Sequence, residues 1–301
     1  MRVFVTGATG FVGSAVVQEL INAGHQVLGL ARSQEAAKKL IEAGAQVHMG
    51  DLENTDSLRS GAAMSDGVIH TGFIHDFSRF KEMCETDGRV IETLGEALMG
   101  SDRPLIITSG IGILNTPDRL ATEQDEPLAS SPNPRIASEF AAAVQAANGV
   151  RVAIVRLPPT VHGEDDHGFV PMLIQIARDK GISVYREAGN NKWPAVHLLD
   201  AATLYRLALE KAPAGLTRYH AAAEEGIAFH DIADAISNGL NIPVVSKSQE
   251  QAAEHFSWFA HFAAMDCAAS AQQTRAELGW QPVQPGLMED LSKGDYFKIT
   301  A

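Results

Sequence analysis

The chain of 301 residues has little of what several classes of protein require. Two cysteines, Cys84 and Cys267, exclude a disulfide framework and a cysteine-rich metal cluster. No apolar run approaches the roughly 20 residues of a membrane helix, and the first residues lack the pattern of a signal peptide. Basic residues number 24 against 37 acidic ones, a net charge of -13. Since nucleic acid requires a basic face, we expect a cytoplasmic protein that binds neither nucleic acid nor a membrane.

The order of the apolar residues indicates the fold class. Short apolar runs alternate with segments of helical periodicity, at residues 3–5, 26–30, 46–49, 68–70, 104–109 and 151–157. This alternation predicts an α/β fold, a Rossmann-type doubly wound parallel sheet with helices on both faces. Residues 115–134 are rich in Asn, Pro, Ser and Asp, and we expect them to form a loop over the active-site face.

A glycine motif follows the first apolar run directly. Gly7, Gly10 and Gly13 are spaced by three residues, and a helical pattern begins among them. A strand, a glycine turn and a helix N-terminus together form a phosphate site, because backbone N–H groups can approach a pyrophosphate closely. The motif therefore predicts dinucleotide binding, although a tight turn that is only rich in glycine is the alternative. The residues predicted to bind here are Thr6, Gly7, Thr9, Gly10, Phe11, Val12 and Gly13.

With Thr6 in front, the motif resembles the T-G-x-x-G-x-x-G of the extended short-chain dehydrogenase/reductases, the family of the sugar-nucleotide epimerases and dehydratases. Weaker likeness extends over nearly the whole chain, as in Leu278-Gly279-Trp280-Gln281-Pro282. The resemblance implies an NADP(H)-binding Rossmann domain of residues 1–161, completed by about 196–222. It also implies a smaller C-terminal α+β substrate lobe of residues 162–195 and 223–301. A homodimer, formed through a long helix over residues 77–99, is a further expectation from the family.

The cofactor type is predicted from the end of the second apolar run. An NAD site usually has an acidic residue about 20 residues after the glycines, but this chain has Arg32 and Ser33. A guanidinium group suits a 2′-phosphate, so we predict NADP(H), with NAD(H) and a plain surface arginine as the alternatives. Ser33 is the predicted N-cap of a helix over 34–43, and its hydroxyl is also predicted to contact the phosphate.

The resemblance adds four residues to the cofactor site. It implies that Asp51 accepts a hydrogen bond from the adenine amino group, with Leu52 next to it, whereas the alternative is an ordinary turn aspartate. Thr71 and Gly72 stand where the family has a run of small residues against the ribose and pyrophosphate.

The family's catalytic residues are replaced. Relatives carry a Ser or Thr after the fifth strand and a Tyr-x-x-x-Lys on the next helix. Here Gly110 stands at the serine position, with Ser109 before it, while Arg135 and Glu139 stand at the tyrosine and lysine positions. No Tyr or Lys occurs at residues 82–179. The pattern resembles the atypical members of the family, which keep the glycines and lose the catalytic residues.

These replacements have two interpretations. An arginine cannot serve as a general acid near neutral pH, but Arg135 could orient a carbonyl or stabilise an oxyanion. Alternatively, Glu139 pairs with Arg135 as an ordinary helix ion pair at i, i+4.

His162 is the candidate proton donor. The run Arg156-Leu157-Pro158-Pro159-Thr160-Val161-His162-Gly163 resembles a family segment that passes beside the nicotinamide, with His162 at a tyrosine position. A hydrogen-bonded loop histidine is the alternative. The histidine spacing matches no zinc signature, so we predict no metal. Five aromatic residues line a pocket or pack the small lobe: Trp193, Phe256, Trp258, Phe259 and Phe262.

Three functions follow from these observations. The first is an NADP(H)-dependent oxidoreductase for a small carbonyl-like molecule, polarised by Ser109 or Arg135 and protonated by water or His162. The second is an NADP(H)-binding sensor without turnover. The third, a sugar-nucleotide epimerase or dehydratase, normally relies on the missing tyrosine.

Overall fold

The computed structural model describes residues 1–114, 116 and 119–298, and its centre is a parallel sheet of seven strands. The strand order is β10-β6-β5-β4-β1-β2-β3, which contains the 3-2-1-4-5-6 order of doubly wound folds. The predicted α/β class is therefore confirmed. The strands are β1 Arg2–Thr6, β2 Gln26–Ala31, β3 Gln46–Met49, β4 Gly67–His70, β5 Pro104–Gly110, β6 Arg151–Leu157 and β10 Leu216–His220.

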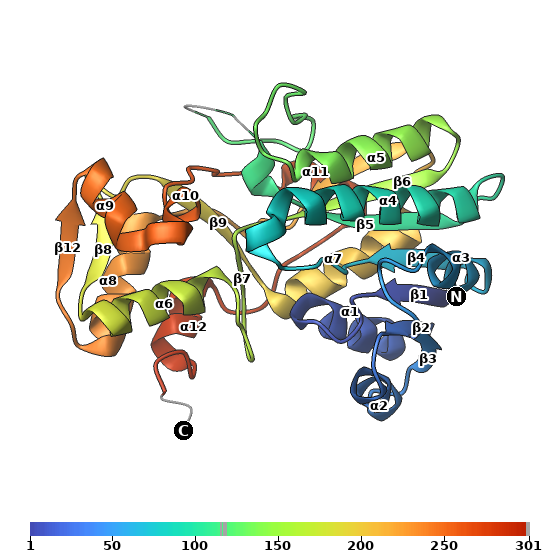
Figure 1. Cartoon of the computed structure of the whole chain (residues 1–301), viewed down its shortest axis with the longest axis horizontal. Helices are drawn as coiled ribbons and strands as arrows, with labels where there is room; N and C mark the ends of the chain where they lie inside the picture. The colour runs from blue at the N-terminus through green and yellow to red at the C-terminus, as the bar shows by residue number, and fades with distance from the viewer. Residues whose placement is uncertain (115, 117–118, 299–301) are drawn as a thin grey trace.

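Helices cover both faces of this sheet (Figure 1). Along β1, Val3 and Val5 are buried against the helices of one face, whereas Phe4 is buried in the core of the other. Strands buried on both faces need continuous apolar runs, as the sequence has. On one face lie α1 Phe11–Asn22, α2 Gln34–Glu42 and α7 Leu198–Lys211; on the other lie α3 Thr55–Ala63, α4 Phe80–Leu98 and α5 Ile136–Ala147.

A second lobe lies beyond the carboxyl ends of the strands, on the left of Figure 1. Its sheets are β11-β9-β7 and β12-β8. The limits predicted for the two domains stay a prediction, but β10 does return to the main sheet. The remaining elements are β7 Thr160–His162, α6 Phe169–Lys180, β8 Ser183–Arg186, β9 Lys192–His197, β11 Glu224–Ala228, α8 Phe229–Leu240, β12 Val244–Lys247, α9 Gln249–Phe256, α10 Ala260–Ala263, α11 Gln272–Leu278 and α12 Leu287–Lys293, with 3-10 turns η1 Phe77–Arg79, η2 Ile111–Ile113 and η3 Ser257–Phe259.

The loop predicted at 115–134 ties the two lobes together. Ala121 N–H donates to Ala268 O at 2.9 Å, and the Glu123 carboxylate accepts bonds from Thr274 N at 2.8 Å and Thr274 Oγ1 at 2.7 Å. Residues 115, 117 and 118 lie outside the described residues. The middle of the loop is therefore an anchor, which fixes the second lobe against the sheet.

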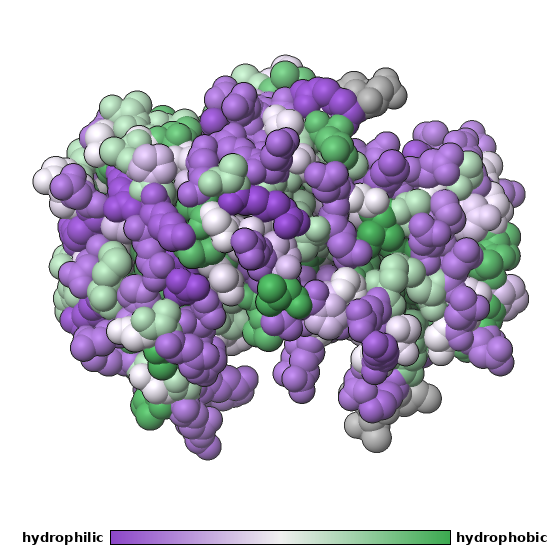
Figure 2. Space-filling view, turned by 180° about the vertical axis from the view of Figure 1, so that it is seen from behind, coloured by the Kyte–Doolittle hydropathy of each residue, from purple (hydrophilic) through white to green (hydrophobic). Residues whose placement is uncertain are grey.

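Seen from behind, the surface is mostly polar and is indented along its lower edge between the lobes (Figure 2). The apolar side chains of Phe140 and Val144 on α5 are 42% and 53% exposed. In the part of the chain that the structure describes, no helix is long and apolar enough to span a bilayer.

Candidate cofactor and active site

In the glycine motif, backbone atoms from the end of β1, the start of α1 and the segment after β4 lie in close contact. We call this arrangement the glycine interlock. Gly7 has φ of +67°, and a Cβ there would lie 2.6 Å from Gly72 N. A Cβ on Gly13 would lie 2.0 Å from Gly7 O. Since real side chains do not tolerate such distances, Gly7 and Gly13 are required for the chain to take this path.

The N-terminus of α1 fits a pyrophosphate. Gly10 is its N-cap and supplies no side-chain cap, and the first turn contains no acidic residue. The backbone N–H groups of Phe11, Val12 and Gly13 therefore have no intrahelical acceptor, and the helix dipole favours an anion there. Thr9 and Gly10 are exposed at the tip of the same turn.

Two threonines fasten the turn to β4. Thr71 Oγ1 donates to Thr6 O at 2.8 Å. Thr6 Oγ1 bonds to His70 Nδ1 at 2.6 Å. Gly72 lies against Leu52, because a Cβ on Gly72 would lie 3.1 Å from the Leu52 side chain. The small residues predicted at 71 and 72 thus form one wall of the glycine turn.

The residues predicted for the adenosine end lie at the ends of β2 and β3. Ser33 is the N-cap of α2, as predicted, since its Oγ accepts a bond from Ala36 N at 3.1 Å. Arg32 is exposed and, among the described residues, makes no ion pair or hydrogen bond. Asp51 Oδ1 accepts N–H groups from Glu53 and Asn54, both at 2.9 Å, so one carboxylate oxygen holds a local turn.

Arg135 is held by a buried aspartate on the neighbouring helix. Its Nη1 donates to Asp87 Oδ2 at 2.6 Å, its Nη2 donates to Thr108 O at 3.0 Å, and its guanidinium lies 4.5 Å from the Phe73 ring centroid. Asp87 also accepts bonds from His70 Nε2 at 3.0 Å and Ser138 Oγ at 2.5 Å. Burial works to raise the pKa of Asp87, but the Arg135 charge and these bonds outweigh it and hold that pKa far below its usual range.

Sequence reasoning missed Asp87, although a signal existed. Asp87 is buried on α4 together with Val90 and Leu94, three and seven residues further on. A charged residue in the buried repeat of an amphipathic helix requires a partner. That requirement could have directed attention to Arg135.

The alternative interpretation, an ion pair between Arg135 and Glu139, is wrong. Glu139 accepts bonds from Arg156 Nε and Nη2, both at 2.7 Å, and both side chains are buried. The reason is that α5 turns Glu139 toward β6, while Arg135, at the start of the helix, extends to α4.

A buried histidine extends this second ion pair. Arg156 Nη1 donates to His220 Nε2 at 3.1 Å, so the His220 proton lies on Nδ1, which donates to Ser270 O at 2.9 Å. Burial and the Arg156 charge lower the pKa of His220 to about 3. Ser109 pairs with Arg156 in the sheet register and is 3% exposed, and its Oγ has no partner among the described residues.

His162 is buried at the junction with the second lobe. Its Nδ1 is 2.6 Å from Asp290 Oδ2 on α12, and its ring centroid is 5.4 Å from that of His197. Within the described residues, its Nε2 has no partner. An acidic group that orients one ring nitrogen and leaves the other available is the arrangement of a general acid or base. His162 thus lies between β9 and α12.

The C-terminal residues also hold the loop after β7. Tyr296 Oη accepts a bond from Gly163 N at 3.0 Å and donates to Asp166 Oδ2 at 2.9 Å. The same loop places the His167 ring 5.4 Å from the ring of Phe11, at the glycine turn. The two lobes therefore meet over the predicted cofactor site.

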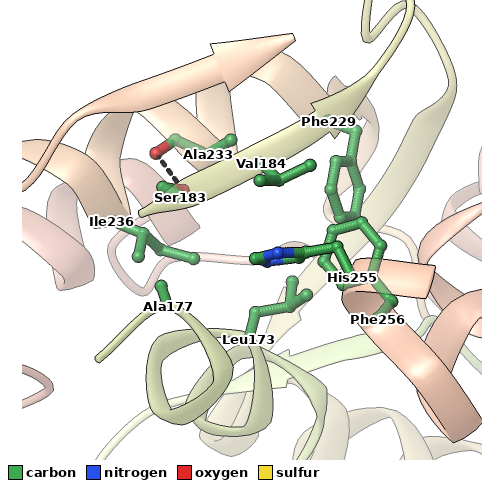
Figure 3. A pocket seen from close by; sticks show the side chains of 9 residues that line it. All are labelled: Leu173, Ala177, Ser183, Val184, Phe229, Ala233, Ile236, His255 and Phe256. Atoms are coloured by element: carbon green, nitrogen blue, oxygen red, sulfur yellow. Dashed lines mark hydrogen bonds between the residues drawn. The ribbon is translucent and has the colours of Figure 1, made fainter. Parts of the chain in front are cut away.

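A small cavity inside the second lobe is not a substrate site. It lies between α6, β8 and α8, its volume is about 10 Å³, and nine side chains line it, with His255 among apolar groups (Figure 3). This volume admits about one water molecule. Burial first, then the charges of Lys180 and Lys247, lower the pKa of His255 to about 4.

Among the described residues, no three His, Cys, Asp or Glu side chains are grouped as a metal requires.

Known proteins resemble this chain over most of its length. A model described as the NAD dependent epimerase/dehydratase family matches residues 3–221. An uncharacterized protein of Schizosaccharomyces pombe is 51% identical over 99% of this chain and 100% of its own. The 4-hydroxy-2-methyl-3-oxo-4-farnesyl-3,4-dihydroquinoline-1-oxide ketoreductase of Stigmatella aurantiaca is 28% identical over 71% of this chain and 66% of its own.

A solved structure shows the same fold. MoeE5, in complex with UDP-glucuronic acid and NAD, superposes with a TM-score of 0.75 at 21% identity, over 99% of this chain and 98% of that chain.

Proposed function

The chain belongs to the NAD dependent epimerase/dehydratase family, and we propose that it is an NADP(H)-dependent oxidoreductase of the atypical short-chain type that acts on a small carbonyl-like substrate. The observation that carries the proposal is the uncapped N-terminus of α1 behind interlocked Gly7, Gly13 and Gly72. The relative named as a ketoreductase supports the reaction type.

Arg32 supports the choice of NADP(H). It is exposed at the end of β2 and, among described residues, unpaired, so its guanidinium fork is free to bind a 2′-phosphate. The first N–H groups of α1 would hold the pyrophosphate. Asp51 would bind the adenine through Oδ2, because Oδ1 accepts the two N–H groups of the local turn. When bound, the reduced cofactor supplies the hydride.

Arg135 and His162 carry the remaining chemistry in this proposal. Arg135 would orient the substrate oxygen with the guanidinium N–H groups that do not bond to Asp87 or Thr108. The bond to Asp87 keeps the Arg135 side chain in place. His162 Nε2, or water, would supply the proton, with Asp290 holding the ring. Ser109 would need to turn from its buried position to reach the substrate.

A cofactor-binding sensor without turnover is the second candidate. The ion pairs of Arg135 with Asp87 and of Glu139 with Arg156 favour it, because both groups at the former tyrosine and lysine positions already have partners. A sugar-nucleotide epimerase or dehydratase is the third, and it lacks the tyrosine base.

A fluorescence titration with NADPH and NADH tests the cofactor. NADPH should bind at least tenfold tighter, about 1.4 kcal/mol, and Arg32→Ala should abolish this preference. Lys38→Ala is the matched control, because Lys38 is an exposed cation of α2 that pairs with Glu42. Equal binding of NADH to the wild type would refute the role of Arg32, and absence of binding of either would refute the oxidoreductase.

Turnover separates the enzyme from the sensor. NADPH oxidation with a panel of aldehydes, ketones and enones should show a rate that Arg135→Ala and His162→Phe reduce while NADPH affinity persists. A sensor would bind NADPH and give no rate with any of these compounds.

A further inference from the structure

Five aromatic side chains from both lobes form a continuous strip, which we call the aromatic strip: Phe73, Phe77, Phe80, Trp258 and Phe262. Phe77 is its centre. The Phe77 ring centroid lies 5.5 Å from that of Trp258, 5.8 Å from that of Phe262 and 6.0 Å from that of Phe80. Phe73 joins at 6.2 Å from Phe80. The strip therefore crosses from the segment after β4 to the turn between α9 and α10.

One end of the strip lies at the candidate active site. Phe73 directly follows Gly72 of the glycine interlock, and the Arg135 guanidinium lies 4.5 Å from the Phe73 ring centroid. Arg135 occupies the position at which the family carries its catalytic tyrosine. A molecule lying on the strip could thus present a polar group to Arg135.

The strip is not sealed like the aromatic core beside it. Trp258 is 56% exposed, whereas Trp193 and Phe259 in the core of the lobe are both 0% exposed. The four phenylalanines of the strip are half-buried. Packing of the small lobe explains Trp193 and Phe259, but it does not require a large exposed indole next to other open rings.

The charges beside the strip disfavour a nucleoside diphosphate. Recognition of a diphosphate needs cations that are free to form bidentate bonds. Arg79 pairs with Glu82, Lys81 with Glu85, and Arg135 with Asp87. Aromatic rings instead prefer another ring, stacked or edge-on, with centroids 4.5–7 Å apart, which is the spacing within the strip.

We propose that the aromatic strip binds the ring of an aromatic ketone or aldehyde, whose carbonyl then lies toward Arg135. The assignment of this compound as a substrate rests on the proposed function. In the reduction, the carbonyl carbon gains a hydride from NADPH, which becomes NADP⁺, and the oxygen gains one proton from water or His162; the product is the aromatic alcohol.

Trp258 is a built-in reporter of binding, because Trp193 and Trp280 are fully buried. Acetophenone should quench the tryptophan emission of the full chain, with and without NADP⁺, and the Trp258→Phe protein serves as the optical blank. Cyclohexyl methyl ketone has the same carbon skeleton with a saturated, puckered ring, so it should displace acetophenone at least fivefold less effectively. UDP-glucose should not displace it.

Two phenylalanine variants form the matched pair. Phe77→Leu should raise the Kd of acetophenone at least fivefold, and should raise KM with little change in kcat. Phe140→Leu removes an exposed phenylalanine on the outer face of α5 and should leave both values unchanged. Equal binding of the two ketones, an unaltered Kd in Phe77→Leu, or displacement by UDP-glucose would each overturn the proposal.

The two proposals fail separately. Strip-dependent quenching without NADPH oxidation would leave the aromatic ligand in place and remove the oxidoreductase. NADPH oxidation that is equal for both ketones and indifferent to Phe77→Leu would retain the oxidoreductase and remove the strip as its substrate site.

Discussion

The two halves of the site are built by different means. At the proposed cofactor end, a side chain on Gly7 would collide with the backbone of Gly72, and one on Gly13 would collide with Gly7 O. At the proposed catalytic end, around α5, Arg135 and Glu139 are held by charged partners from other elements, Asp87 and Arg156.

We propose that this difference lets one chain keep the glycine motif while other residues stand at the positions of the family's catalytic ones. A backbone interlock has one solution, because only glycine fits. An ion-pair cluster accepts other residue types as long as each buried charge finds a partner. The following predictions test this contrast, from the largest expected effect to the smallest.

Glu139→Gln should cause the largest loss of stability. It leaves the buried Arg156 guanidinium without its carboxylate, and breaking a buried pair by removing one partner costs roughly 3–5 kcal/mol. Urea unfolding followed by circular dichroism measures the change. The double variant Glu139→Leu with Arg156→Met should recover much of the loss. Arg218, 3.6 Å from Glu139, loses the same carboxylate. A loss below about 1 kcal/mol in the single variant would contradict the dependence of these buried cations on Glu139.

Gly13→Ala should weaken NADPH binding at least 100-fold, about 2.7 kcal/mol. The new Cβ would lie 2.0 Å from Gly7 O, so the turn must move away from the N-terminus of α1. Ser14→Ala, the next residue, is the control: its Oγ only donates to Phe11 O at 3.0 Å, and NADPH affinity should persist. Unchanged affinity in Gly13→Ala would contradict the interlock.

Acid should destabilise the catalytic half through His220. Its pKa falls from 6.5 to about 3 on folding, chiefly through burial and then the Arg156 charge. Between these values only the unfolded chain binds the proton, so the free energy of unfolding falls as pH falls, by at most about 1.4 kcal/mol per unit. His220→Gln should flatten this dependence, and adding His255→Gln should flatten it further, since the pKa of His255 is also lowered, to about 4. An unaltered slope between pH 6 and 4 would contradict this account.

Phe140→Glu should have the smallest effect on stability, within about 0.5 kcal/mol, because the side chain is 42% exposed. It adjoins Glu139 in the sequence, so the two variants compare the outer and inner faces of α5. The resemblance implies a dimer through the helix over residues 77–99, and α5 packs beside that helix. We propose that two copies pair through α4 and the adjoining outer face of α5. Light scattering should then show half the mass in the variant, whereas an unchanged mass would refute this pairing.

Local features were predictable from the sequence. Alternating apolar runs predicted the sheet. The helix pattern after Ser33 predicted its N-cap, which needs only a bond from Ala36, three residues away. The glycine spacing predicted the turn of residues 7–13, in which a Cβ on Gly13 would meet Gly7 O. In the cap and in this turn the interacting groups are close in the chain, so the residue pattern records the interaction.

Distant partners were not predictable. Asp87 is 48 residues from Arg135, and Asp290 is 128 residues from His162. Glu139 has one arginine four residues before it, Arg135, and a distant one on β6, Arg156. It pairs with Arg156 because α5 turns Glu139 toward β6. Spacing along a helix shows which pairs can form, whereas burial decides which pair must form.

The position of β10 in the chain has a consequence for biosynthesis. This strand covers the outer side of β6 from Leu216 to His220, yet it is translated only after β7, β8 and β9 of the other lobe. Until residue 220 has left the ribosome, β6 keeps a free row of N–H and C=O groups, which is a template for pairing with another nascent chain. The parallel sheet can therefore be completed only after the segments of the other lobe up to β9 have been synthesised.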